Sequence, residues 1–157
     1  MTPAQMRRAN KSARCSWAQV KNAVVPRLVI DILLPSDSVL DFGAGPEALH
    51  ARWLRWNGFN VMAHEIGMNR RLDHGHNGDR QYDVVYASNV LNVQPDEAHI
   101  NRVAAHLAML ARKIVVVNYP TSPRYSGVSE GRVEEILRRR FSRVVPSWRH
   151  VWVCIVS

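Results

Sequence analysis

The sequence predicts a three-layer α/β sandwich around a mostly parallel sheet, and three observations lead to this prediction. Apolar strand segments alternate with amphipathic helix segments along the chain. The strands at 82–87 and 113–118 are nearly continuous β-branched or aromatic runs, which is typical of strands covered on both faces. The chain has 157 residues, 46% of them hydrophobic, which is enough for one substantial core. We therefore expect residues 1–157 to form a single domain.

The first third of the chain predicts an arm, a helix and a strand. Residues 1–15 show no apolar periodicity, and we interpret them as a basic N-terminal arm. Apolar residues recur every three or four positions over 16–34, which predicts one amphipathic helix that Pro26 kinks. After a turn, the apolar run at 38–42 predicts the first strand.

The next segment continues the alternation of helix and strand. Pro46 suits the first turn of a helix, where its missing amide hydrogen is harmless, and Asn57-Gly58 ends that helix. Residues 59–65 predict the second strand. The polar stretch 67–80 predicts a loop with one short strand around Leu72.

The second half of the chain predicts two buried strands, two helices and a closing strand region. A strand at 82–87 is followed by a helix that begins at Pro95 and by a strand at 113–118. A helix at 128–141 and one or two strands within 144–157 complete the chain. In such sheets ligands bind at the carboxyl ends of the strands, so the residues after each strand are the first candidates for a site.

A glycine-containing loop follows the first strand, and an acid ends the second. The loop has the sequence Asp41-Phe42-Gly43-Ala44-Gly45 and precedes a helix. Two glycines one residue apart let the backbone turn sharply and approach a ligand closely. Glu65 stands where a carboxylate can accept hydrogen bonds from both hydroxyls of a ribose. This pattern indicates a cofactor that contains a nucleoside.

Two cofactor classes compete for this loop. Gly43-x-Gly45-x-x-Ala48 fits a relaxed dinucleotide-binding pattern, which would imply an NAD-dependent oxidoreductase. Asp41, two residues before the first glycine, argues against that class because a carboxylate repels a pyrophosphate. The same carboxylate favours a ligand that carries a cationic amino acid group.

The loop, Glu65 and the run Tyr82-Asp83-Val84-Val85 together resemble class I S-adenosylmethionine-dependent methyltransferases. The resemblance covers about residues 16–157 and is that of a small, minimal or phage-type member. It implies a Rossmann-like fold whose sheet has an antiparallel C-terminal strand, supplied here by 151–156. It also implies S-adenosyl-L-methionine as cofactor. The sequence departs from the family pattern at Glu47, which replaces the third glycine.

The resemblance assigns cofactor-binding residues position by position. Asp41, Gly43, Ala44 and Gly45 would surround the methionine half, Glu65 would bind the ribose, and Ile66 would lie beside the adenine. The residues flanking the sulfonium would be Ser88, Asn89 and Val90. Arg14 or Lys11, in the arm, would reach the methionine carboxylate, with phosphate contacts or solvated charges as the alternatives. Asp73 and Asp79 are both candidates for the adenine-contacting acid.

The methyl acceptor is harder to infer. The sequence after strand 82–87 lacks the Asp/Asn-Pro-Pro-aromatic motif of amino-methylating nucleobase enzymes, and neither cysteine lies where a cytosine-C5 enzyme needs its nucleophile. Methyl transfer needs mainly in-line positioning, so a missing base does not exclude activity. Asn89, Asn92 and Tyr119 follow predicted strands and are the candidate catalytic residues, with capping or turn roles as the alternative.

Charge is the unusual global property, with a formal net charge of +8. Basic residues gather in the arm and in a C-terminal arginine cluster: Arg7, Arg8, Lys11 and Arg14, and Arg138, Arg139, Arg140 and Arg143. Such clusters favour a polyanionic partner, and we expect a slight preference for a nucleic-acid substrate. A non-catalytic nucleic-acid-binding or partner-binding module with the same fold is the alternative.

Other functional classes find little support in the sequence. No apolar run approaches the ~20 residues that span a bilayer, and two cysteines are typical of a reducing compartment, so we expect a cytoplasmic protein without membrane contact. Asp73-His74-Gly75-His76 has the residue types of a metal site, but such a polar stretch is usually an ordinary loop. We therefore expect no metal.

Overall fold

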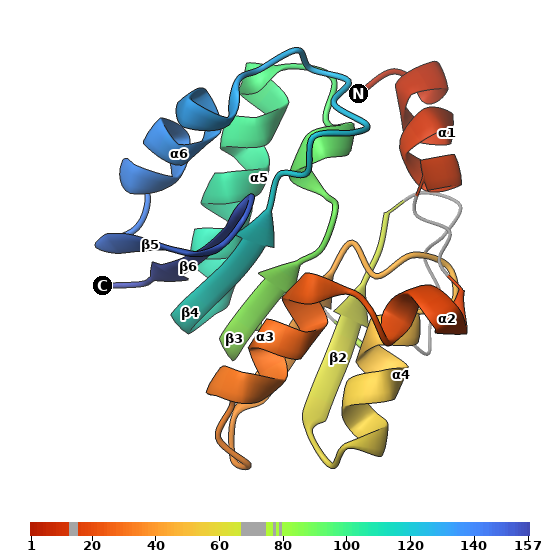
Figure 1. Cartoon of the computed structure of the whole chain (residues 1–157), viewed down its shortest axis with the longest axis vertical. Coiled ribbons are helices and arrows are strands. Elements are labelled where there is room, and N and C mark those ends of the chain that lie inside the picture. Colours follow the sequence, from red (N-terminus) through yellow and green to blue (C-terminus); the bar gives the residue numbers. More distant parts are fainter. Residues whose placement is uncertain (13–15, 67–74, 77, 79) are drawn as a thin grey trace.

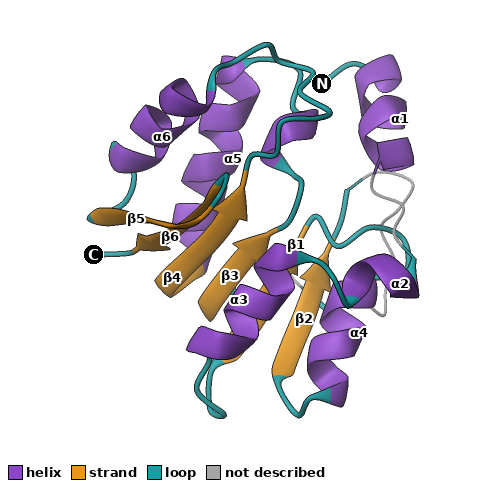
Figure 2. Ribbon diagram, in the orientation of Figure 1, coloured by secondary structure: helices purple, strands orange, loops and turns teal. Residues whose placement is uncertain are grey.

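The computed structural model describes residues 1–12, 16–66, 75–76, 78 and 80–157. It has a central sheet between two layers of helices, as predicted (Figure 2). Helices α3 and α4 cover one face of the sheet, and α5 and α6 cover the other. The described helices are α1 Pro3–Ser12, α2 Trp17–Val20, α3 Val24–Ile32, α4 Leu49–Trp56, the short 3₁₀ helix η3 Leu91–Val93, α5 Glu97–Leu110 and α6 Glu130–Arg138.

The six-stranded sheet has the order β2-β1-β3-β4-β6-β5. Strands β2, β1, β3 and β4 are parallel, whereas β6 runs antiparallel to both of its neighbours. The expected antiparallel C-terminal strand is therefore confirmed, and it lies between β4 and β5. The strands are β1 Ser38–Phe42, β2 Asn60–His64, β3 Tyr82–Ala87, β4 Ala111–Asn118, β5 Arg143–Trp148 and β6 Val151–Ile155.

The N-terminal segment differs most from the sequence prediction. Within the segment interpreted as a basic arm, residues 3–12 form the helix α1 (Figure 1), although they show no apolar periodicity. A capping box starts this helix: the Gln5 amide N–H donates to Thr2 Oγ1 at 3.2 Å, and the Thr2 amide N–H donates to Gln5 Oε1 at 2.7 Å. Pro3 follows the cap at the first helical position, where proline is favoured.

The helix expected over 16–34 is divided into α2 and α3. Ser16 and Gln19 form a second capping box at the start of α2. Pro26 does not kink a continuous helix, because the break precedes it and Pro26 falls in the first turn of α3. The short strand expected around Leu72 lies outside the described residues. Gly75, which is described, pairs in parallel with Ala63 of β2.

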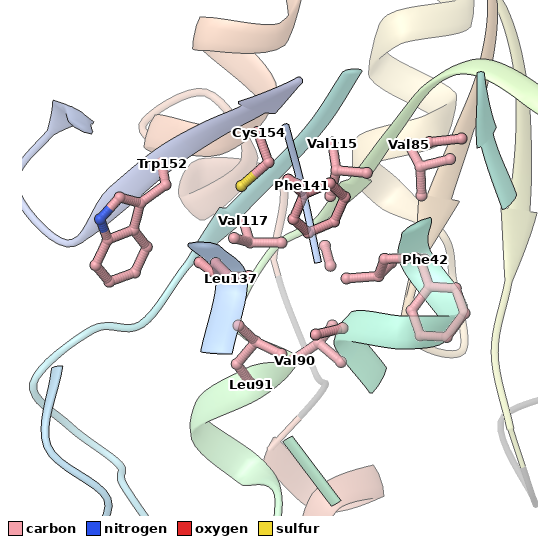
Figure 3. Close-up of a cluster of buried hydrophobic side chains, with 14 of the residues drawn as sticks. Phe42, Val85, Val90, Leu91, Val115, Val117, Leu137, Phe141, Trp152 and Cys154 are labelled. Carbon is pink, nitrogen blue, oxygen red and sulfur yellow. The ribbon is translucent and has the colours of Figure 1, made fainter. Parts of the chain in front are cut away.

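Alternate side chains of the central strands enter two hydrophobic clusters. Leu40 and Phe42 of β1 join the cluster beneath α5 and α6 (Figure 3), and Val39 joins the cluster beneath α3 and α4. Burial on both faces explains the continuous apolar strands. It also fixes the register of β1, so that the residues after Phe42 leave the sheet at its carboxyl edge.

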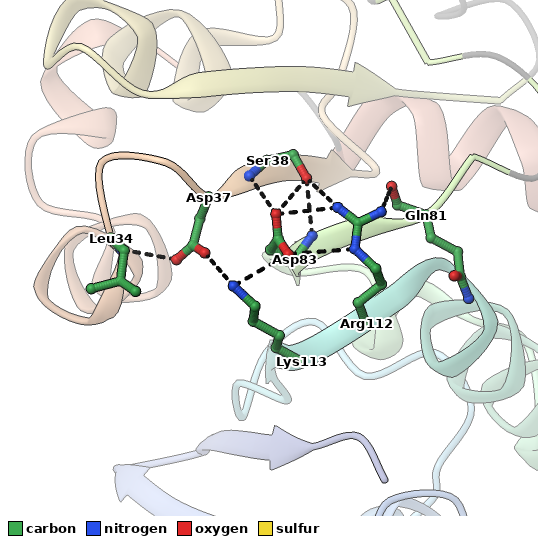
Figure 4. A network of polar contacts seen from close by, with 7 residues as sticks. All are labelled: Leu34, Asp37, Ser38, Gln81, Asp83, Arg112 and Lys113. Atoms are coloured by element: carbon green, nitrogen blue, oxygen red, sulfur yellow. Dashed lines mark hydrogen bonds and ion pairs between the residues drawn. The ribbon is translucent and has the colours of Figure 1, made fainter.

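A polar network secures the opposite, amino edge of the sheet (Figure 4). Asp83 of β3 accepts hydrogen bonds from the backbone amide and the hydroxyl of Ser38, at 2.9 and 2.8 Å. Arg112 and Lys113 of β4 form ion pairs with the same carboxylate, at 3.2 and 3.3 Å. The network thus joins three adjacent strands at the edge away from the glycine loop.

Candidate functional site

A cavity of about 330 Å³ lies at the carboxyl ends of β1, β2 and β3. The residues that follow each of these strands form its floor, and segments from the N-terminal part of the chain cover it. Parallel α/β sheets bind ligands at this edge. The cavity wall consists of Met1, Ala9, Asn10, Gln19, Ala23, Gly43, Ala44, Leu49, His50, Glu65, Ile66, Ser88, Asn89, Val90, Val93 and Gln94.

The glycine loop is held against the end of β2 by backbone hydrogen bonds. The amides of Gly43 and Ala44 both donate to the carbonyl of His64, at 2.8 and 3.0 Å. Gly43 has a φ of +80°, and a Cβ atom built on it would lie 2.4 Å from Cγ2 of Val90. Only glycine fits this position without displacing Val90, which stands on the cavity wall.

Glu65 connects the end of β2 to the glycine loop. Its side chain is buried, and its two carboxylate oxygens accept hydrogen bonds from the backbone amides of Gly45 and Ile66, each at 2.8 Å. Glu65 also lines the cavity, so the same carboxylate supports the glycine loop and belongs to the wall. The next residue, Ile66, is 40% exposed and gives the wall an apolar surface.

The end of β3 contributes a second polar corner. Asn89 has a φ of +60°, a conformation that asparagine tolerates better than most residues. Its backbone amide donates to Asn118 Oδ1 at 2.6 Å, and Asn118 Nδ2 donates to Asn89 Oδ1 at 2.8 Å. This reciprocal pair joins the ends of β3 and β4 and fixes Asn89, with Ser88 and Val90, on the wall.

A second cavity of about 270 Å³ shares part of this wall. The shared residues include Gly43, Glu65 and Ile66. The part of the wall that belongs to the second cavity alone includes Phe42, Val103 and the rings of His64 and His106. The Phe42 ring lies 5.0 Å from that of His64 and 5.2 Å from that of His106, between centroids. The shared wall makes Glu65 and Ile66 the boundary between a mixed polar compartment and an aromatic one.

Two titratable groups near the cavity have pKa values that burial shifts strongly. Burial raises the pKa of the Asp41 carboxyl to about 7, although the Tyr86 hydroxyl and the Ala51 backbone amide oppose the shift. Burial lowers the pKa of His50 to about 4, so this imidazole on the wall is neutral at physiological pH.

The structure brings most of the sequence-predicted cofactor residues to one cavity. Gly43, Ala44, Glu65, Ile66, Ser88, Asn89 and Val90 all lie on its wall. Asp41 and Gly45 are buried behind the wall, and the amide of Gly45 acts on the site through Glu65. Arg14, Asp73 and Asp79 lie outside the described residues.

Of the candidate catalytic residues, only Asn89 lies on the cavity wall. Asn92 is buried, and its Nδ2 donates to the carbonyl of Pro123 at 2.9 Å. Tyr119 is also buried, and its hydroxyl donates to the carbonyl of Val128 at 2.8 Å. The structure therefore gives Asn92 and Tyr119 the loop-supporting roles that the sequence left as the alternative.

The sequence analysis did not identify the covering residues. Met1, Ala9 and Asn10 reach the cavity from the α1 segment, and Gln19 and Ala23 come from α2 and the residues after it. The sequence signal for this cover was the pair of capping boxes that begin at Thr2 and Ser16.

No described helix has the length and apolar character needed to cross a membrane. Among the described residues, no group of three or more histidine, cysteine or acidic side chains is arranged to hold a metal ion.

Comparisons with known proteins place the chain by its fold. No family model and no curated protein matches its sequence. The magnesium protoporphyrin IX methyltransferase of Synechocystis PCC 6803, solved with bound S-adenosylmethionine, has a TM-score of 0.65 and 21% identity over 98% of this chain and 90% of that one. A TehB-like S-adenosylmethionine-dependent methyltransferase of Corynebacterium glutamicum has a TM-score of 0.66 and 14% identity over 99% and 100%. An S-adenosylmethionine-dependent methyltransferase of Aquifex aeolicus gives 0.60 and 12% over the full length of both chains. At these identities the likeness establishes the fold, which is that of class I S-adenosylmethionine-dependent methyltransferases.

Proposed function

We propose that this protein is an S-adenosylmethionine-dependent methyltransferase. One observation carries the proposal. The glycine loop, the pair of Glu65 and Ile66, and the residues Ser88–Val90 at the end of β3 all line one cavity. Each occupies the position that the family resemblance assigns to one part of the cofactor. The fold shared with solved methyltransferases supports the same conclusion.

The wall residues fit the chemistry of this cofactor. Glu65 is a carboxylate on the wall, a group that accepts hydrogen bonds from ribose hydroxyls, and Ile66 offers an apolar surface to a purine ring. The backbone of Gly43 and Ala44 would approach the methionine half, with Ser88 to Val90 on its other side. When bound, S-adenosylmethionine supplies a methyl group on a positively charged sulfur.

The topology favours this cofactor over a nicotinamide dinucleotide. The usual dinucleotide-binding sheet is parallel, with the strand order 3-2-1-4-5-6. In this chain the antiparallel strand β6 lies between β4 and β5. The oxidoreductase alternative therefore rests on the glycine pattern alone.

The protein's own contribution to transfer would be positioning. Methyl transfer requires a nucleophile in line with the sulfonium, and a fixed polar group can hold it there. Asn89 is such a group, because its pairing with Asn118 holds it at the wall. Neutral His50 adds a hydrogen-bonding ring on the same wall.

Calorimetric titration with S-adenosylhomocysteine tests the proposal. We expect micromolar affinity, roughly −8 kcal/mol. Glu65→Ala should weaken binding by about 1–3 kcal/mol, since charge-assisted hydrogen bonds are lost. Glu135→Ala, which removes an exposed carboxylate of α6 far from the cavity, is the matched control.

Two outcomes would change the assignment. Thermal stabilisation by NADH but not by S-adenosylhomocysteine would favour the oxidoreductase and overturn the proposal. Normal S-adenosylhomocysteine binding, with no labelled methyl transferred to nucleic acid, protein or small-molecule acceptors, would favour the non-catalytic binding module.

A further inference from the structure

An open hollow of about 580 Å³ lies between α1 and the loop that carries Tyr125. Arg7, Arg8, Lys11 and Tyr125 line it. Ala9 and Asn10 of the same helix face the cavity itself. Helix α1 therefore separates the two spaces, with its cations on one side and its small and amide side chains on the other.

The charge of this face is uncompensated within the helix. The α1 sequence contains no acidic residue, and Arg7, Arg8 and Lys11 are all exposed. Arg7 and Lys11 are four residues apart, so they project from the same side of the helix. Neither of them forms an ion pair with any residue that the structure describes.

The C-terminal arginine cluster is different in both place and environment. It follows the end of α6, on the opposite side of the molecule from α1 (Figure 1). Arg138 pairs with Glu134 at 2.6 Å, and Arg139 lies 4.0 Å from Glu135. The two clusters expected to bind a polyanion therefore do not form one surface, and only the α1 cluster adjoins the cavity.

Tyr125 adds an aromatic group to the basic face. The guanidinium of Arg8 lies 4.9 Å from the centre of the Tyr125 ring, within the range of a cation–π interaction. The Tyr125 amide donates to the carbonyl of Asn92 at 3.0 Å, which ties this loop to η3. Val93 of η3 stands on the cavity wall, so Tyr125 is anchored next to the cavity.

We propose that Arg7, Arg8, Lys11 and Tyr125 form a docking surface for a single-stranded nucleic acid that is the methyl acceptor. Cations with an aromatic ring between them are the combination that tracks a phosphate backbone and stacks unpaired bases. An unpaired strand exposes its bases to an aromatic side chain such as Tyr125, whereas a duplex keeps them stacked on one another, so a single strand fits this arrangement better. The inference rests on the proposed methyltransferase function.

Fluorescence anisotropy with a labelled strand of about 16 nucleotides, as DNA and as RNA, tests the docking surface without requiring turnover. In the Arg7→Gln/Lys11→Gln variant we expect roughly tenfold weaker binding at low salt. The slope of log affinity against log salt should fall by about 1.4, because each phosphate contact on a single strand contributes about 0.7. Tyr125→Leu should weaken binding by about tenfold through lost stacking, and Tyr125→Phe should retain it.

Arg140→Gln/Arg143→Gln is the matched control, because it removes the same charge from exposed residues of the distant cluster. It should leave affinity and salt slope nearly unchanged. Equal loss in both double variants would show that only net charge matters and would overturn the proposal. So would equally tight binding of the matching duplex.

Titration with S-adenosylhomocysteine separates this inference from the proposed function. The α1 variants should bind S-adenosylhomocysteine like the wild type, since the mutated side chains face away from the cavity. If strand binding depends on α1 but S-adenosylhomocysteine does not bind, the methyltransferase proposal fails while the docking surface stands. If S-adenosylhomocysteine binds and strand binding does not depend on α1, the docking surface fails alone.

Discussion

Replacing Gly43 with alanine tests whether the glycine loop shapes the cavity as the structure indicates. An alanine at a φ of +80° adopts a left-handed conformation, which costs about 1–2 kcal/mol. Its Cβ would also lie 2.4 Å from Cγ2 of Val90, and displacing that packed side chain adds about 1–3 kcal/mol. We expect the unfolding free energy to fall by about 2–5 kcal/mol in total, which leaves a folded protein if its stability is typical.

The same change should impair ligand binding, because Gly43 and Val90 both stand on the cavity wall. We expect at least about tenfold weaker S-adenosylhomocysteine binding by calorimetry, or about 1.4 kcal/mol. Gly58→Ala is the matched control: Gly58 has a φ of +90°, but nothing lies within 4 Å of the added Cβ. In Gly58→Ala the unfolding free energy should fall only by the cost of the left-handed conformation, and the affinity for S-adenosylhomocysteine should not change.

Adding Val90→Ala to Gly43→Ala removes the clashing methyl group and should restore part of the lost stability, measured by urea unfolding. The conformational cost at position 43 should remain. If Gly43→Ala is no less stable than Gly58→Ala and binds S-adenosylhomocysteine normally, Val90 does not constrain the loop and the reasoning is refuted.

Two further predictions concern stability and pH. Because burial raises the folded-state pKa of Asp41 to about 7, its contribution to stability is full below about pH 4 and is lost as pH rises through 7. In urea unfolding, the unfolding free energy of Asp41→Asn relative to the wild type should therefore rise by about 2–4 kcal/mol from pH 4 to pH 8. A difference that does not change with pH would contradict this. Asp83 behaves oppositely: the Ser38 amide, with Arg112 and Lys113, holds the pKa of its carboxyl well below the usual range, so its stabilisation is present above about pH 4 and declines as pH falls below that. Asp83→Asn should cost about 1–3 kcal/mol at pH 7 and less at pH 3, whereas Asp31→Asn on the exposed side of α3 should cost little at either pH.

The sequence predicted the sheet well because burial on two faces leaves a strong local pattern. β1, β2 and β3 lie within a residue of the predicted strands, and β4 begins at Ala111 instead of 113. The glycine loop and Glu65 were predictable for a related reason. A strand, a turn with two glycines and a helix can be connected in few ways, and an acid after the next parallel strand lies at the same edge.

The family resemblance placed the arm near the cofactor, but the helix within the arm was not predicted, because α1 has a weak apolar pattern. In α1 the residues that face the cavity are Ala9 and Asn10, which produce no amphipathic signal. Helices this short are marginal alone, so the packing of α1 against η3 and of α2 against α4 determines their positions. Capping boxes at Thr2 and Ser16 are local signals, and they would have indicated the starts of these helices.

The contrast between floor and cover explains why a sequence motif indicates the cofactor and none indicates the acceptor. The floor is built from backbone hydrogen bonds and a buried carboxylate. The amides of Gly43 and Ala44 donate to the His64 carbonyl, and the amide of Gly45 donates to the Glu65 carboxylate. Such geometry depends on few residue types, so it leaves a recognisable motif. The cover depends on side chains of α1 and α2, which many residue types can supply. Acceptor recognition at the cover would therefore be expected to vary between proteins that share this floor, and in this chain the covering helix α1 carries three exposed cations.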